Sequence, residues 1–205
     1  MEFKDHFPWW GSWVLGRELS DGEKACFASH YKLWQECVKL DEPIIILEDD
    51  VEFSDEFLNN GAEYIDELLK SEYEYIRLCY LFDKRLYFLS EGGYYLSFEK
   101  LAGAQGYVLQ VSAAMKFLKC AKNWIYAVDD YMDMFYRHNV LNIVKKPLLL
   151  KHDCRIRIES SISQAGRLFL KAKFHRKIIR EIFRLYRNIL KLSYTFYIKK
   201  KLDIS

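Results

Sequence analysis

Apolar side chains recur at helical spacing in the segment that follows Ser20. Phe27, Tyr31 and Trp34 are three or four residues apart and would share one face of a helix. Ser20 and Glu23 form the Ser-x-x-Glu pattern, in which the two side chains satisfy backbone amides at a helix start. We therefore expect a helix that begins at Ser20 and turns its apolar face toward a core.

A run of four aliphatic residues, 44–47, comes next and predicts a strand buried on both faces of a parallel or mixed sheet. Ser54 then has the character of a helix cap, and a helix is expected over roughly 55–70. Further apolar patterns predict strands within 75–81, 94–98, 106–110 and 142–150, and helices over 112–122 and 128–138. This alternation of helices and strands predicts an α/β domain.

The composition is that of one globular domain, with 205 residues of which 51% are hydrophobic. The first residues carry two acids and no basic region, so we expect no signal peptide. The longest uncharged stretch, 101–115, contains glycine and glutamine, which argues against a transmembrane helix. Five cysteines without a Cys-x-x-Cys pair indicate reduced thiols and a cytoplasmic protein.

Charge divides the chain into an acidic body, residues 1–167, and a basic tail, residues 168–205. Residues 171–201 hold eleven Lys and Arg against the single Glu181, so this segment contributes +10 to a chain whose net charge is +2. The tail has one apolar stripe at helical spacing, formed by Phe174, Ile178, Ile182, Tyr186 and Ile189. We expect a basic amphipathic helix that lies peripherally on the anionic inner face of the cytoplasmic membrane.

Other interpretations of the tail remain open at this point. The helix can pack on the body, or its charged face can simply be solvated. Binding to nucleic acid is not expected, because the body is acidic and the tail lacks the aromatic and basic interleaving of an RNA-binding sheet.

Three consecutive carboxylates, Glu48, Asp49 and Asp50, follow the predicted strand 44–47. Ligands of α/β proteins bind at the carboxyl ends of the strands, and these acids lie at such an end. Crowded carboxylates repel one another unless a cation such as Mg²⁺ or Mn²⁺ shares them. The alternative is a strand that ends in a solvated acidic turn, and position alone does not decide between the two.

Four ordered blocks of sequence resemble glycosyltransferase family 25, whose bacterial members build lipooligosaccharide. The first block, EKACFASHYKLWQECVKLDEPIIILEDDVEF, matches the family's Ser-His, Trp and Ile-x-Glu-Asp-Asp pattern. GAQGYVLQ resembles its Gly-Thr-x-Gly-Tyr segment, with Ala104 in place of threonine. AVDDYMDMF and the later SSIS…GR are similar to two further family elements. The resemblance spans roughly residues 18–167.

The resemblance implies a GT-A type fold, which is a Rossmann-related mixed sheet flanked by helices, and a metal-dependent, inverting hexosyltransferase. The expected donor is UDP-galactose and the expected acceptor is a lipooligosaccharide or lipopolysaccharide. By the same resemblance, Asp50 with Asp49 or Glu48 would hold Mn²⁺ or Mg²⁺ against the donor diphosphate. His152 is a further candidate metal ligand, since late histidines serve this role in some GT-A enzymes.

The reaction requires a base that deprotonates the acceptor hydroxyl. Asp129 and Asp130 are the candidates, and Asp129 matches the family pattern better; their alternative role is that of a solvated helix N-terminus. The candidate residues for contact with donor or acceptor are Ser29, His30, Gly103, Gln105, Gly106 and Tyr107. His30 can instead pin its helix to the acidic strand, and the glycines and tyrosine can belong to a buried strand and turn.

The N-terminal region departs from the family pattern. Family members have a strand of the type vxxInLxxxxeR some 60 residues or more before the acidic motif, and here the motif begins at residue 48. The aromatic segment 7–13 stands in that region and is either core or acceptor-facing surface. The second interpretation of the chain is therefore a shortened, non-catalytic family member that binds a glycan or a protein partner.

Overall fold

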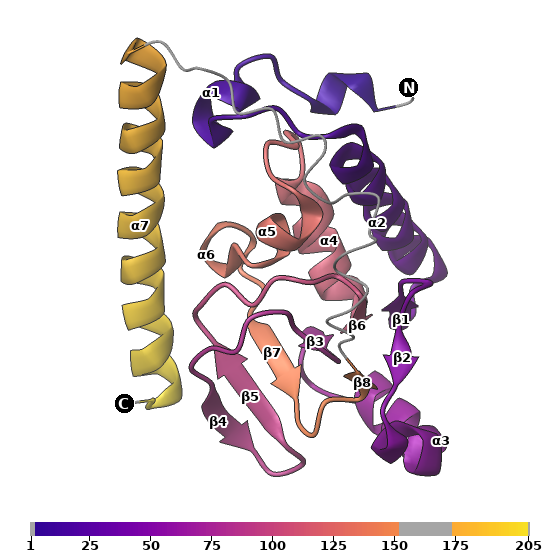
Figure 1. Ribbon diagram of the computed structural model, residues 1–205. Helices are drawn as coiled ribbons and strands as arrows, with labels where there is room; N and C mark the ends of the chain where they lie inside the picture. Colours follow the sequence, from indigo (N-terminus) through magenta and orange to yellow (C-terminus); the bar gives the residue numbers. More distant parts are fainter. Residues whose placement is uncertain (1–2, 152–173, 205) are drawn as a thin grey trace.

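The computed structural model describes residues 3–151 and 174–204 (Figure 1). The helices are η1 (Lys4–His6), α1 (Gly11–Leu15), α2 (Asp21–Leu40), α3 (Asp55–Leu69), α4 (Val111–Cys120), α5 (Val128–Met132), α6 (Phe135–His138) and α7 (Phe174–Leu202). The strands are β1 (Ile44–Leu47), β2 (Glu52–Phe53), β3 (Tyr75–Arg77), β4 (Tyr87–Ser90), β5 (Tyr94–Ser97), β6 (Gly106–Leu109), β7 (Asn142–Lys145) and β8 (Leu150–Lys151).

Six of the strands form one mixed sheet in the order β1-β6-β3-β7-β5-β4. The pair β3–β7 is parallel, and the other neighbours in this sheet are antiparallel. The short strands β2 and β8 pair separately. The α/β class and the mixed sheet flanked by helices, both expected from the sequence, are confirmed.

The two faces of the sheet bury different clusters because side chains alternate along each strand. Tyr75 and Tyr107 point into a cluster that includes Trp34 of α2 and Phe117 of α4. The neighbouring residues of the same strands point the other way, into a cluster that includes residues of α3 and the end of α7. The first of these faces carries the helix that positions the candidate site.

The predicted start of α2 is confirmed in detail. The Ser20 side chain accepts from the Glu23 backbone amide, and the Glu23 carboxylate accepts from the Ser20 amide, which completes the expected capping box. Ser54 likewise caps α3 through the Phe57 amide. The predicted elements at 94–98, 106–110 and 112–122 are also present, as β5, β6 and α4.

The prediction that strand 44–47 is buried on both faces is confirmed only in part, because the strand packs on both faces but is not fully buried. Among the described strands, β1 lies at the edge of the sheet and pairs with β6 alone, and Leu47 is 41% exposed. Ile46 is buried in the cluster that contains Trp34 of α2, whereas Ile45 is partly buried and packs against the cluster on the opposite face. Apolar composition alone does not distinguish this edge position from a central one.

Three other predicted elements are shorter or broken. The strand predicted within 75–81 ends at Arg77. The helix predicted over 128–138 is divided into α5 and α6 at Met134, whose ψ is 54°. The preceding residue, Asp133, accepts hydrogen bonds from groups on three other segments. The strand predicted over 142–150 is divided into β7 and β8 around Pro147, which has no backbone N–H to continue a ladder.

The aromatic N-terminal segment is partly core. Phe7 is half-buried and meets Trp124 edge to ring at 5.2 Å, and His6 stacks on the same indole at 4.7 Å. Val14 of α1 is buried, whereas Trp9 is 75% exposed. The segment therefore belongs to the body, with only part of it left as surface.

The basic tail forms a helix, as predicted, and lies along α1 and α6 (Figure 1). It turns basic side chains toward the body: Arg176 lies over the Trp13 ring and Arg187 over the Tyr126 ring, both at 5.0 Å. From Ile178 to Ile189 the apolar stripe faces solvent, with Ile182 at 60% and Ile189 at 54% exposure. Among the helices within the described residues, none combines the length and apolarity needed to cross a membrane.

We expect stability to fall with acid below pH 6.5 because of His138. Its Nδ1 accepts from the Val140 amide and its Nε2 donates to the Tyr131 carbonyl, so the buried ring is neutral. Burial lowers the pKa of His138 to about 3. The unfolded chain binds this proton near pH 6.5, and stability is therefore lost progressively between pH 6.5 and 3, by about 1.5 kcal/mol between pH 6.5 and 5.

Urea unfolding at pH 6.5 and pH 5 measures this loss. In His138→Gln the difference between the two pH values should shrink by that amount, although the variant is less stable at both. An unchanged difference would show that other groups cause the acid sensitivity.

Candidate active site

A pocket of about 270 Å³ lies at the end of β1, where segments distant in sequence converge. Its lining residues are Arg17, Glu23, Cys26, Glu48, Leu81, Lys100, Gly103, Ala104, Gln105, Ala127, Val128, Asp129 and Asp130. We call it the acidic pocket. It brings together the first carboxylate of the acidic run, the loop before β6 and the aspartate pair at the start of α5.

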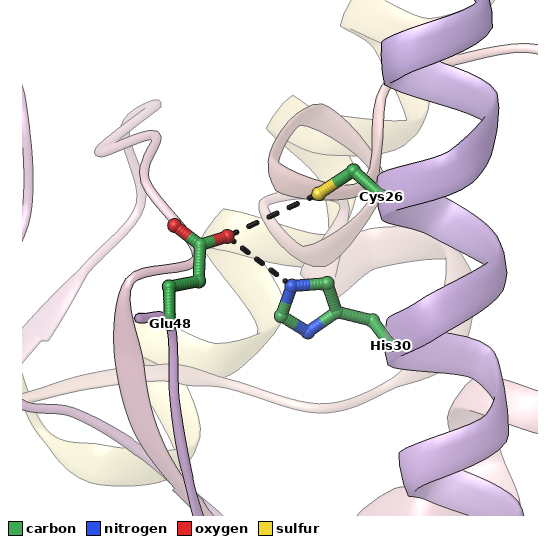
Figure 2. Close-up of side chains that lie close together, drawn as sticks. All are labelled: Cys26, His30 and Glu48. Atoms are coloured by element: carbon green, nitrogen blue, oxygen red, sulfur yellow. Dashed lines mark hydrogen bonds and ion pairs between the residues drawn. The ribbon is translucent and has the colours of Figure 1, made fainter. Parts of the chain in front are cut away.

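Glu48 enters this pocket from the end of β1 and is held there by α2. Figure 2 shows its carboxylate facing Cys26 and His30, which are one helical turn apart on α2. The His30 Nε2 lies 3.3 Å from Glu48 Oε1, and the Cys26 thiol lies 3.9 Å from the same oxygen. The Glu48 backbone amide also donates to the Gln105 carbonyl at 2.8 Å, which ties the acidic run to the loop before β6.

A chain of hydrogen bonds behind Glu48 sets the tautomer of His30. The Trp34 indole can only donate, so the Tyr107 hydroxyl accepts from it at 2.9 Å. That hydroxyl then donates its own proton to His30 Nδ1 at 2.8 Å, which leaves the His30 proton on Nε2, facing Glu48. The buried core of α2 thus presents a donor to the pocket carboxylate.

The three side chains around Glu48 also form a set that can bind metal. A sulfur of Cys26, a nitrogen of His30 and an oxygen of Glu48 lie within 4.8 Å of one another. Such a mixed set suits Zn²⁺ better than the oxygen-seeking Mg²⁺ or Mn²⁺. Burial, with Glu48 nearby, raises the pKa of the Cys26 thiol to about 12, so without a cation the thiol keeps its proton and donates it to Glu48.

The other expected metal ligands do not gather around Glu48. Asp49 and Asp50 lie in the turn that follows β1 and are exposed. His152 lies outside the described residues. In the described part of the chain, the acidic run therefore offers one carboxylate to the pocket and two on the exposed turn after β1, which fits a hard cation only if a ligand's phosphates supply most of the oxygens.

Asp129 and Asp130 both line the acidic pocket, at the start of α5. Asp130 forms an ion pair with Lys100, and burial together with the charge of Asp129 raises the Asp130 pKa. Asp129 makes no ion pair with any residue in the described ranges. Its carboxylate is therefore the freer of the two to accept a proton.

The loop from Ala102 to Gln105 is fixed by a buried ion pair. Arg77 donates to Asp133 Oδ1 at 2.9 Å and to the Ala102 carbonyl at 3.0 Å, and it also binds the Gly103 carbonyl. Asp133 in turn accepts from the Ala102 amide at 2.9 Å. The φ of Gly103 is +81°, and a Cβ there would collide with the Gln105 side chain, so glycine is required for this loop.

Four residues expected to contact donor or acceptor, Ser29, His30, Gly106 and Tyr107, do not line the acidic pocket. His30 is buried and reaches the pocket only through its contact with Glu48. Tyr107 is fully buried behind the pocket, and its hydroxyl is hydrogen-bonded to Trp34 and His30. The expected direct contact with sugar is therefore corrected: Tyr107 positions His30 instead. Gly106 is also buried, and a Cβ there would collide with Leu150, which explains this glycine by packing. Ser29 is exposed on α2 and bonds the Ala25 carbonyl.

The sequence interpretation missed several residues of the pocket. Arg17 forms a two-point contact with Glu23, at 2.6 Å for each bond, and this pairing overcomes the opposing effect of burial to lower the Glu23 pKa. Lys100 is the partner of Asp130. Cys26 could have been predicted from the sequence, because it precedes His30 by four residues and so shares its helix face. No sequence feature pointed to Arg17 or Lys100.

Comparisons with known proteins agree with this arrangement. Residues 1–132 match a protein family described as glycosyltransferase family 25 (LPS biosynthesis protein). Lipooligosaccharide biosynthesis protein lic2B of Haemophilus influenzae is 46% identical over 67 residues, covering 31% of this chain and 25% of that protein.

Two animal proteins are similar over a comparable stretch. The probable inactive glycosyltransferase 25 family member 3 of Rattus norvegicus is 36% identical over 66 residues, 32% of this chain and 12% of the relative. Procollagen galactosyltransferase 2 of Homo sapiens is 32% identical over 71 residues, 34% of this chain and 11% of the relative. The matches thus span a quarter or less of the length of these relatives.

Proposed function

Because the chain belongs to glycosyltransferase family 25, we propose that it transfers a hexose from a nucleotide-sugar donor to a glycan acceptor. The finer proposal is galactose from UDP-galactose, a lipooligosaccharide acceptor and inversion at the anomeric carbon. The names of two relatives support it, one being a lipooligosaccharide biosynthesis protein and one a procollagen galactosyltransferase.

The observation that carries the proposal is the convergence of Glu48, Asp129 and the loop Gly103–Gln105 on one pocket. These residues come from three of the four sequence blocks that carry the family resemblance. A solvated acidic turn, the alternative for Glu48, would not place its carboxylate against a buried histidine and a thiol. The pocket thus has both the acidity and the defined hydrogen bonds of a reaction site.

The residues of the pocket have distinct roles in the proposed reaction. Asp129 accepts the proton of the acceptor hydroxyl as that oxygen attacks the anomeric carbon. Lys100 holds Asp130 beside it and contributes a positive charge. Glu48, fixed by His30 and Cys26, is positioned to accept a hydrogen bond from a sugar hydroxyl. The loop fixed by Arg77 and Asp133 sets the opposite wall.

A Mg²⁺ or Mn²⁺ ion is part of the proposal, and Asp50, Asp49 and Glu48 would hold it. When bound, such an ion stabilises the negative charge that a leaving nucleoside diphosphate gains. Asp49 and Asp50 are exposed, so most of the oxygen ligands of the ion would come from the phosphates of the donor.

We expect UDP and UDP-galactose to bind at least tenfold more tightly with Mn²⁺ or Mg²⁺ than with chelator, and Asp50→Ala to abolish that metal-dependent gain. Calorimetry of the wild-type chain with Mn²⁺, and then with excess chelator, measures this directly. Asp66→Ala, which removes an exposed carboxylate from α3, is the matched control and should bind like wild type. Unchanged affinity in Asp50→Ala would contradict the assigned metal role.

A non-catalytic family member that binds a glycan or a partner is the second candidate function. One observation favours it: a relative of comparable identity is named probable inactive. The same calorimetric experiment separates the two candidates, because a chain that binds no UDP with or without metal lacks the donor half of the reaction.

Peripheral binding to the inner membrane face is also proposed for α7. Six exposed apolar residues of this helix follow one another at three or four positions: Ile178, Ile182, Leu185, Ile189, Leu192 and Phe196. Three consecutive lysines, 199–201, end the helix and would favour anionic lipid. Arg180 and Arg187 line the side of α7 that faces the body. Only part of the positive charge that was expected to flank the apolar stripe can therefore contact lipid.

We expect co-sedimentation with vesicles that contain phosphatidylglycerol, and little with phosphatidylcholine alone. Ile182→Asp with Ile189→Asp should weaken binding at least tenfold, since a buried charge replaces apolar insertion. Leu58→Asp with Met115→Asp changes two exposed apolar residues on other helices and should bind like wild type. Vesicle binding that is equal in all three proteins would contradict the role of α7.

A further inference from the structure

A groove of about 460 Å³ lies between α7 and the body, beside the acidic pocket. One wall is α7, and the other is formed by α1 and by residues of α5 and α6, which lie next to α7 in Figure 1. The basic side chains that line it are Lys100, Arg180, Arg184, Arg187 and Lys191. We call it the basic groove; it shares Lys100 and Asp130 with the acidic pocket, so the two spaces adjoin.

The carboxylates of the basic groove already have cationic partners. Asp133 is bound by Arg77 at 2.9 Å, and Asp130 is bound by Lys100. The third, Glu181, pairs with Arg184 at 2.6 Å on the same helix. Over residues 3–151 and 174–204, the ion pairs made by α7 involve Glu181 alone, which leaves Arg187 and Lys191 without a carboxylate.

Arg187 is a basic residue of the groove that has a defined position and no carboxylate partner among the described residues. Its guanidinium lies 5.0 Å from the centroid of the Tyr126 ring, which fixes the position of the charge. Its Nε is buried and has no hydrogen-bond partner. The Nε is closed to the groove, so an anion would instead contact the rest of the Arg187 side chain, which lines the groove and has no carboxylate partner among the described residues.

We infer that the basic groove binds a phosphate-bearing group of a ligand whose reacting end occupies the acidic pocket. Arginine presents a planar fork of donors that matches phosphate oxygens, and α7 places three arginines and a lysine along one wall. The inference rests on the proposed function, because it assigns the groove to the same ligands. Two sources share this chemistry: the diphosphate of the donor, and a phosphate carried by the acceptor glycan.

The test uses inorganic pyrophosphate, titrated by calorimetry into the full chain in the presence of chelator, so that no metal contributes. Arg187→Gln with Lys191→Gln should weaken binding at least tenfold. Lys39→Gln with Lys177→Gln removes the same charge from exposed positions outside the groove and should leave binding unchanged. If the double variant does not fold, Lys191→Gln alone should still weaken binding at least threefold.

The outcomes distinguish a donor phosphate from an acceptor phosphate, and they test the groove separately from the proposed transfer reaction. If the groove variants also weaken UDP binding measured with Mn²⁺, the phosphate belongs to the donor; if UDP binding is unchanged, it belongs to the acceptor. The inference is overturned if the wild-type chain binds no pyrophosphate, or if the control pair loses as much affinity as the groove pair. Pyrophosphate binding without any UDP binding would uphold the groove and contradict the proposed transfer reaction.

Discussion

Asp129→Asn is expected to lower kcat for hexose transfer by about 10²–10⁴-fold, the usual contribution of a general base. The asparagine side chain has the same shape but accepts no proton at neutral pH. The measurement is turnover at saturating UDP-galactose with Mn²⁺ and a lipooligosaccharide acceptor. KM for the donor should change little, because Asp129 is assigned to the acceptor hydroxyl.

Asp130→Asn provides the matched comparison at the neighbouring position. Its carboxylate is already committed to Lys100, so we expect a smaller loss of turnover than in Asp129→Asn. The reverse order would assign the base to Asp130, whose raised pKa also suits proton transfer. Wild-type turnover in both variants would dismiss the pair.

Asp133→Ala is expected to destabilise the fold by about 3–5 kcal/mol, because it leaves the buried Arg77 charge without its partner. Arg77 is 1% exposed and Asp133 is 8% exposed, so solvent cannot replace the lost contact. The Ala102 amide and the Asn142 side chain lose an acceptor in the same change. Urea unfolding at neutral pH measures the loss.

A double-mutant cycle identifies the origin of this effect. Arg77→Met combined with Asp133→Ala should cost less than the two single changes together, by about 1–3 kcal/mol. Glu36→Ala is the control, because it breaks an exposed pair with Lys39 and should change stability by less than about 1 kcal/mol. Additive losses in the cycle would show that the two residues act through separate contacts.

The elements that the sequence predicted well are those set by local chemistry. The capping box of Ser20 and Glu23 requires only residues of the helix start, and short apolar runs were enough to predict β5 and β6. The errors arose where distant groups compete with local preference. The break between α5 and α6 is an example, since the backbone leaves the helical region at Met134, next to Asp133, whose carboxylate binds Arg77 and the Ala102 amide.

The candidate site shows the same division. Glu48, Asp129 and Gly103 were predicted, and the acidic pocket contains all three. The role of Tyr107 could not be predicted, because its hydroxyl faces Trp34 and His30 only once α2 packs on β6. Lys100 and Arg17 lie in segments without a distinctive pattern, and their contribution depends entirely on how the chain folds.

The edge position of β1 has a consequence for hydrogen exchange. On the outer side of this strand no described strand pairs with it, so alternate backbone amides there should exchange with deuterated solvent sooner than those of β6, which has a strand on each side. Such local opening would loosen the strand that leads into Glu48. The carboxylate would nevertheless keep its place, since its amide is bound to the Gln105 carbonyl and its side chain to α2.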